Sequence, residues 1–137
     1  MTKSLAAVAF LVPDYDDAIA WFRQALGFDL IEDAPLGADK RWVVVAPAGR
    51  GGARLVLAKA ADPLQREAIG KAAGGRVAYF LETDDFARDH AAMSARGVRF
   101  FEAPRREAYG IVAVFADPWG GRRDLLQPAG QAATAPR

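Results

Sequence analysis

The chain has 137 residues, of which 52% are apolar and 26% are charged, a composition typical of a folded globular domain. Eighteen Lys and Arg stand against 17 Asp and Glu, so the net charge of +1 provides no basic excess for a nucleic acid, and we expect no such partner. With no cysteine and one histidine, the sequence excludes disulfides, thiolate metal sites and cysteine nucleophiles.

The N-terminal apolar run, residues 5–12, is stopped by Pro13 and Asp14 and is too short to span a bilayer. No small-residue cleavage pattern of a signal peptide follows it. We therefore expect a cytoplasmic protein that does not bind a membrane. Residues 129–137 are rich in Ala, Gly and Pro and are expected to form a flexible tail.

The first half of the chain predicts one strand, one helix and three further strands. The strand covers residues 5–12, and the helix covers residues 14–26, with Asp14 as its N-cap and Gly27 as its end. The helix has a single apolar stripe, formed by Ala18, Trp21, Phe22, Ala25 and Leu26. Short apolar runs separated by Gly, Pro and Asp predict the later strands at 28–32, 42–45 and 54–58.

The second half repeats this order. It predicts a strand over 77–82, a helix that starts at Asp84 and Asp85 and ends at Gly97, and strands over 98–102, 111–115 and 124–127. Between the halves, residues 60–75 form a linker in which 64–73 are compatible with a helix that Gly74 and Gly75 end.

The repeat predicts an α+β fold of two tandem βαβββ modules. Module one covers residues 4–59 and module two covers residues 76–128, within a single domain of residues 1–128. One module alone would bury too little surface to be comfortably stable, so two should pack together, either within a chain or between two chains.

Several short motifs carry a resemblance to a known family. They are Val12–Ala18 with Leu26-Gly27-Phe28 in the first half, and Thr83–Phe86, Arg96-Gly97-Val98 and Asp117–Gly121 in the second. In this order and spacing, the chain resembles the vicinal oxygen chelate superfamily of glyoxalase I, bleomycin-resistance proteins and extradiol dioxygenases. The resemblance implies that the modules curl into an open, barrel-like cleft, commonly in a homodimer.

Enzymes of that superfamily hold a divalent metal with His and Glu from the first and fourth strands of each module. The two histidine positions correspond here to Ala7 and Ala78, and residues 51–60 contain no ligand-type side chain. Only Asp124 falls on a family ligand position, and one ligand of four cannot hold a metal tightly. The resemblance therefore implies a member with a deficient metal site and no expected cofactor, a bound divalent metal being the disfavoured alternative.

Two carboxylates are weak candidates for chemistry. Asp124 is either a lone carboxylate that faces the cleft and binds a cationic or hydroxylated ligand or acts as a base, or the ion-pair partner of Arg122 on the same strand face. Glu82 either points into the cleft or lies at a strand end in solvent. His90, in the middle of the second helix, is interpreted as structural.

Aromatic side chains on strands suit a flat, apolar ligand, with core or dimer packing as the alternative for each. Trp42, which follows a polar loop, is the leading candidate. Arg105 and Arg106, expected in a loop, are either an anion clamp or solvated charges. The predicted ligand-binding set is Trp42, Phe80, Phe101, Tyr109, Phe115, Trp119 and Arg122.

The sequence supports two alternative functions, which belong to different classes of protein. The first is a metal-free small-molecule-binding protein, similar to the bleomycin-resistance branch, that sequesters a ligand in an aromatic-lined cleft; the missing ligand set and the retained strand aromatics favour it. The second is an enzyme of the lyase, isomerase or dioxygenase type with an atypical or metal-independent site that uses Asp124 and Glu82. A third alternative is a dimerisation scaffold.

Overall fold

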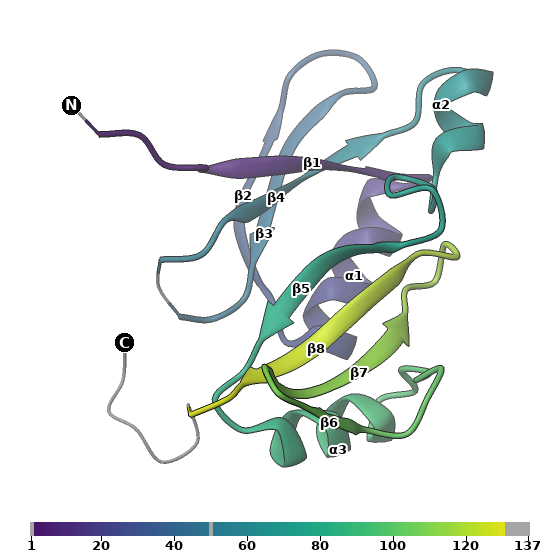
Figure 1. Cartoon of the computed structure of the whole chain (residues 1–137). Coiled ribbons are helices and arrows are strands. Elements are labelled where there is room, and N and C mark those ends of the chain that lie inside the picture. Colours follow the sequence, from purple (N-terminus) through teal and green to yellow (C-terminus); the bar gives the residue numbers. More distant parts are fainter. Residues whose placement is uncertain (1, 50, 131–137) are drawn as a thin grey trace. The chain divides into compact units, whose positions relative to one another are not determined.

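A computed structural model describes residues 2–49 and 51–130. The chain divides into two compact units, Met1–Ile69 and Gly70–Arg137, and their boundary lies inside the predicted linker. Each unit contains a four-stranded mixed sheet with a helix against it (Figure 1). The predicted α+β fold of two βαβββ-like modules is confirmed.

The sheet of the first unit has the order β1-β4-β3-β2. Strand β1 pairs with β4 in parallel, whereas β3 pairs antiparallel with both β2 and β4. The elements in chain order are β1 (Ala7–Val12), α1 (Tyr15–Leu26), β2 (Asp29–Pro35), β3 (Arg41–Ala46) and β4 (Arg54–Lys59).

Helix α1 begins and ends as the sequence predicts. Asp14 is the N-cap, and its Oδ2 accepts a hydrogen bond from the backbone N–H of Asp17 at 2.9 Å. Gly27 ends the helix in the left-handed conformation, with φ of 69°. The apolar stripe packs on the sheet through Phe22, whose ring centroid lies 5.7 Å from that of Phe10. The core of this unit therefore lies between α1 and one face of its sheet.

The helix in the linker is shorter than predicted. Helix α2 covers only Pro63–Ala68, although residues 64–73 are compatible with a helix. The chain turns at Gly70, which has φ of 78°, and a Cβ atom at Gly70 would lie 2.0 Å from the carbonyl oxygen of Trp119. A glycine so close to another backbone segment marks the point at which the chain leaves the helix.

The sheet of the second unit repeats the arrangement, with the order β5-β8-β7-β6. Strands β5 and β8 are parallel, and β7 is antiparallel to β8 and β6. The elements are β5 (Val77–Glu82), α3 (Phe86–Ala95), β6 (Arg105–Glu107), β7 (Gly110–Ala116) and β8 (Arg122–Pro128).

The strand predicted over residues 98–102 is wrong. The segment pairs with β7 through one isolated bridge between Phe100 and Phe115, flanked by two backbone hydrogen bonds, and it forms no continuous strand. The edge strand β6 forms later, at Arg105 and Arg106, which the sequence placed in a loop. The reason is a side chain: Glu102 Oε2 accepts the backbone N–H of Val114 at 3.1 Å, a hydrogen bond that a strand carbonyl would otherwise accept.

The core of the second unit lies between α3 and one face of its sheet. Phe115 and Leu125 are almost fully buried on this face, as are Phe86 and Met93 on the helix. The His90 ring lies 5.4 Å from that of Phe86 and 4.2 Å from that of Phe100, in agreement with a structural role. No helix within the described ranges is long and apolar enough to cross a membrane. The predicted tail lies outside the described residues from residue 131 onward.

Candidate functional site

The face of the second sheet that points away from α3, called here the open face, contains the candidate carboxylate. Residue pairing places Phe80 of β5 and Val114 of β7 beside Asp124 of β8. Paired residues point to the same face of a sheet and successive residues alternate, so these three side chains share the open face. Leu125, the next residue of β8, faces the helix and the core.

Asp124 is buried on this face, with only 7% of its surface exposed. Among the described residues its Oδ1 atom is buried and has no hydrogen-bond partner. Burial raises the pKa of the Asp124 carboxyl, while the charge of Arg105 opposes the rise and that of Glu102 adds to it. A buried acceptor without a donor lowers the free energy of unfolding by about 1–3 kcal/mol, so this side chain destabilises the fold.

The ion pair between Asp124 and Arg122, the structural alternative from the sequence, does not form among the described residues. The guanidinium of Arg122 lies instead over the ring of Phe101, 4.2 Å from its centroid, and Arg99 lies over the same ring at 4.8 Å. Arg105 pairs with Glu102 at 3.0 Å and also with Glu107. The arginines nearest Asp124 therefore have other partners.

The other predicted ligand-binding residues have different degrees of exposure. Phe80 and Tyr109 are the most exposed, at 62% and 55%. Trp42 is 39% exposed and belongs to β3 of the first unit, on the face of that sheet opposite to α1. Trp119 is half-buried, and its backbone N–H donates to Asp117. Phe115 is fully buried, its ring 5.8 Å from that of Phe100 on the helix side of the sheet.

Glu82, the second candidate carboxylate, lies at the end of β5 and is exposed. It pairs in register with Leu126, two residues beyond Asp124, and so shares the open face. Its position agrees with both sequence interpretations, since a strand end can face a ligand and solvent.

Sequence reasoning missed a buried ion pair directly beneath this face. Arg123 Nη2 lies 2.7 Å from Asp117 Oδ2, and the two side chains are 1% and 0% exposed. Asp117 Oδ1 also accepts the backbone N–H groups of Trp119 and Gly121, at 2.8 and 2.9 Å. The pair therefore fixes the turn that leads into β8. Its sequence signal was an Asp and an Arg of opposite charge on either side of a turn with two glycines.

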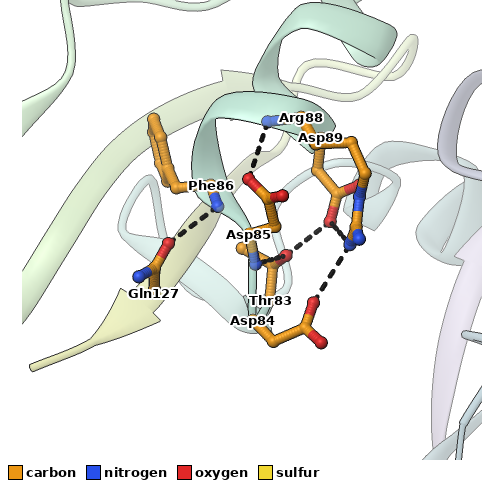
Figure 2. A network of polar contacts seen from close by, with 7 residues as sticks. All are labelled: Thr83, Asp84, Asp85, Phe86, Arg88, Asp89 and Gln127. Atoms are coloured by element: carbon orange, nitrogen blue, oxygen red, sulfur yellow. Dashed lines mark hydrogen bonds and ion pairs between the residues drawn. The ribbon is translucent and has the colours of Figure 1, made fainter. Parts of the chain in front are cut away.

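A second polar network fixes the other end of β8 to α3 (Figure 2). Gln127 Oε1 accepts the backbone N–H of Phe86 at 2.8 Å, at the start of the helix. Asp85 caps the helix by accepting the N–H of Arg88 at 3.1 Å. Arg88 in turn pairs with Asp84 at 3.0 Å, and Asp89 accepts from Thr83. Strand β8, which carries Asp124, is thus held at both ends.

A metal site of the superfamily needs several donor side chains in one place. No group of three or more His, Cys, Asp or Glu that could hold a metal ion occurs in the part of the chain that the structure describes. Of the residues beside Asp124 in the sheet, Phe80 and Val114 have no donor atom in their side chains. Function without a metal stays a prediction.

Comparison with known proteins agrees with the fold. The model of the Glyoxalase/Bleomycin resistance protein/Dioxygenase superfamily matches residues 4–122, and the chain belongs to this superfamily. An uncharacterized protein of Shewanella frigidimarina is 49% identical over 128 residues, which are 93% of this chain and 95% of that protein.

Two solved structures are similar over nearly the whole chain. TnmS3, described as an antibiotic binding protein from Streptomyces sp. CB03234, is 31% identical, with a TM-score of 0.77 over 93% of this chain and 98% of its own. UcmS2 is 28% identical, with a TM-score of 0.79 over 92% of this chain and 98% of its own.

The burial of Asp124 gives a pH-dependent prediction. Its folded pKa is raised, so its contribution to stability is fully present below the unfolded pKa of about 3.9 and is lost as the pH rises through the folded value. Asp124→Asn removes this loss, and we expect it to raise the free energy of unfolding by about 1 kcal/mol at pH 7 and to change it little near pH 3.

Urea unfolding of both proteins at the two pH values measures this difference. Glu67→Gln, at an exposed position on α2, is the control and should change the free energy of unfolding by less than about 0.5 kcal/mol. A loss of stability at pH 7 for Asp124→Asn would show that the carboxylate has a stabilising partner.

Proposed function

We propose that this protein binds a flat, aromatic small molecule on the open face of the second sheet and holds it without a metal and without converting it. The carrying observation is the exposed ring of Phe80 beside the buried carboxylate of Asp124. The antibiotic-binding protein TnmS3, similar along 93% of this chain, supports a small molecule as the ligand.

The physical argument rests on rings held at or near the surface. Phe80 exposes 62% of its surface, so a ligand that covers it removes apolar area from water at about 25 cal/mol per Å². Phe101 is held in place by the guanidinium groups of Arg122 and Arg99. A ring fixed before binding loses little conformational freedom when the ligand arrives, which favours affinity.

A metal-independent enzyme is the second candidate, and one observation favours it. Burial raises the pKa of Asp124, and a raised pKa suits a carboxyl that exchanges protons with a substrate near neutral pH. The homodimer that the resemblance implies is the expected assembly for either function.

Titration with a panel of aromatic antibiotics tests the proposal, monitored by isothermal calorimetry. We expect saturable binding of at least one compound with a stoichiometry of about one per chain. We also expect it to weaken roughly tenfold when Phe80→Ala removes the exposed ring. The ligand should be recovered chemically unchanged after prolonged incubation, as measured by liquid chromatography and mass spectrometry.

The control is Leu64→Ala, which removes another exposed apolar side chain, from α2 of the first unit. It should leave the affinity unchanged. A new product that accumulates with time would instead establish the enzyme. Equal losses of affinity for the two variants would show that the ligand does not bind on the open face around Phe80.

A further inference from the structure

We propose that Asp124 anchors a positively charged nitrogen of the ligand, so that the class of molecule bound is a flat aromatic cation. This inference rests on the proposed function, because it names the ligand of the same face. It assigns to the buried carboxylate a partner that the described residues do not provide.

The first argument is the unsatisfied oxygen. Oδ1 of Asp124 is buried and without a hydrogen-bond partner among the described residues, at a position that is 93% covered. Folded proteins rarely leave such an atom unpaired, and those that do commonly use it in function. A ligand N–H donor would restore the missing hydrogen bond.

The second argument is that the neighbouring arginines contact other groups. Arg105 is paired with Glu102 and Glu107, and Arg122 lies over Phe101. Arg123, adjacent in sequence, points to the opposite face and pairs with Asp117. The charge of Arg105 acts on Asp124, but none of these three arginines forms an ion pair with it, so among the described residues its Oδ1 atom is left to accept a hydrogen bond from a ligand cation.

The third argument concerns access. Phe80, the register neighbour of Asp124, is largely exposed and has little packing to lose when its ring rotates. It can move to admit a ligand and then cover it. A ring of the ligand stacked on Phe80 would bring an attached nitrogen to the neighbouring carboxylate.

The arginines over Phe101 offer the opposite chemistry, an anchor for an anionic ligand. Arg122 is exposed, so water and salt screen its charge and weaken any ion pair that it forms. Asp124 is buried, where a charge interacts more strongly with a partner than it does in water. The difference in burial favours the cation.

Three acridines with the same ring system and different charge test the proposal: 9-aminoacridine, a cation at pH 7; acridine, which is neutral; and acridine-9-carboxylate, an anion. Binding to the wild-type protein is measured by the fluorescence of each dye. We expect 9-aminoacridine to bind 10- to 100-fold more tightly than acridine, the range for a hydrogen bond to a charged group. The anion should bind most weakly.

Asp124→Asn, which keeps the shape and removes the charge, should abolish the advantage of 9-aminoacridine and leave the affinity for acridine unchanged. Glu67→Gln, which removes the charge of an exposed carboxylate on α2 of the first unit, should change neither affinity. Circular dichroism confirms that the variants are folded, and the comparison of the three dyes on the wild-type protein needs no variant.

The outcomes separate the two proposals. Equal binding of 9-aminoacridine to the wild type and to Asp124→Asn overturns the anchor while leaving the aromatic-binding function in place. If acridine-9-carboxylate binds most tightly, the Asp124 anchor is contradicted, and the arginines over Phe101 are the anchor for an anionic ligand. If none of the three dyes binds the wild type, the proposed aromatic-binding function itself is contradicted.

Discussion

Arg123→Met is expected to lower the free energy of unfolding by about 3–5 kcal/mol, because it breaks a fully buried ion pair. The variant keeps most of the apolar length of the side chain and removes its charge. The carboxyl group of Asp117 would then be fully buried and without the guanidinium that lies 2.7 Å away. The turn that Asp117 holds through the N–H groups of Trp119 and Gly121 would loosen at the start of β8.

Chemical denaturation of Arg123→Met measures this loss. Arg122→Met is the matched control: it changes the neighbouring arginine, which is exposed and stacks on Phe101, and should cost less than about 1 kcal/mol. Adding Asp117→Asn to Arg123→Met should recover part of the loss, because it removes the uncompensated charge. A loss for Arg123→Met no larger than for Arg122→Met would contradict the importance of the buried pair.

Gly110→Ala is expected to cost roughly 2–5 kcal/mol, because it combines backbone strain with a collision. Gly110 begins β7 with φ of 149°, a conformation that residues with a side chain rarely adopt. A Cβ atom there would lie 2.2 Å from the carbonyl oxygen of Gln127 in β8. The two strands would have to separate at the point where Gly110 pairs with Pro128.

Gly120→Ala separates the strain from the collision. Gly120 also has positive φ, at 89°, but no atom of the described residues would lie within 4 Å of a Cβ atom there. Its substitution should cost about 1 kcal/mol, at most half the expected effect at Gly110. Thermal unfolding measures the loss of stability in each variant. Equal losses would show that glycine is not required at residue 110 by the close contact with β8.

Most of the fold could be predicted because local signals agreed with it. Asp14 and Gly27 bound α1 in both the sequence and the structure, and residues 77–82 form a strand with the predicted bounds. Caps, turns and apolar periodicity act over a few residues, so they are visible in the sequence. The repeat of the same order in both halves then indicated two modules of one kind.

The predicted strand over 98–102 failed because a distant group decides its structure. The segment is rich in apolar and aromatic residues, as a strand should be, but the carboxylate of Glu102 accepts the hydrogen bond from the backbone N–H of Val114, twelve residues away. The end of α2 is a different case, because Gly70, with φ of 78°, is a local stop signal inside the predicted span 64–73. The contact between Glu102 and Val114 leaves no such local pattern.

The candidate site was predicted in its residues but not in its arrangement. Asp124 and Phe80 were both candidates, whereas their position side by side required the register between β5 and β8. Phe115 is buried because its side chain lies on the helix side of the sheet. The stacking of the Arg122 guanidinium on the ring of Phe101 depends on where the chain runs after α3. The pairing of all strands in the sheet fixes the register and the face on which each side chain lies.

The central claim, binding of an aromatic ligand without a metal, is tested most directly by native mass spectrometry of the untagged protein with the ligand found by titration. The measurement is made on protein treated with EDTA and on protein given one equivalent of zinc, nickel, manganese or iron. We predict one ligand per chain, bound with the same affinity in every sample and without an added metal mass. A ligand that binds only together with a metal ion would contradict the account.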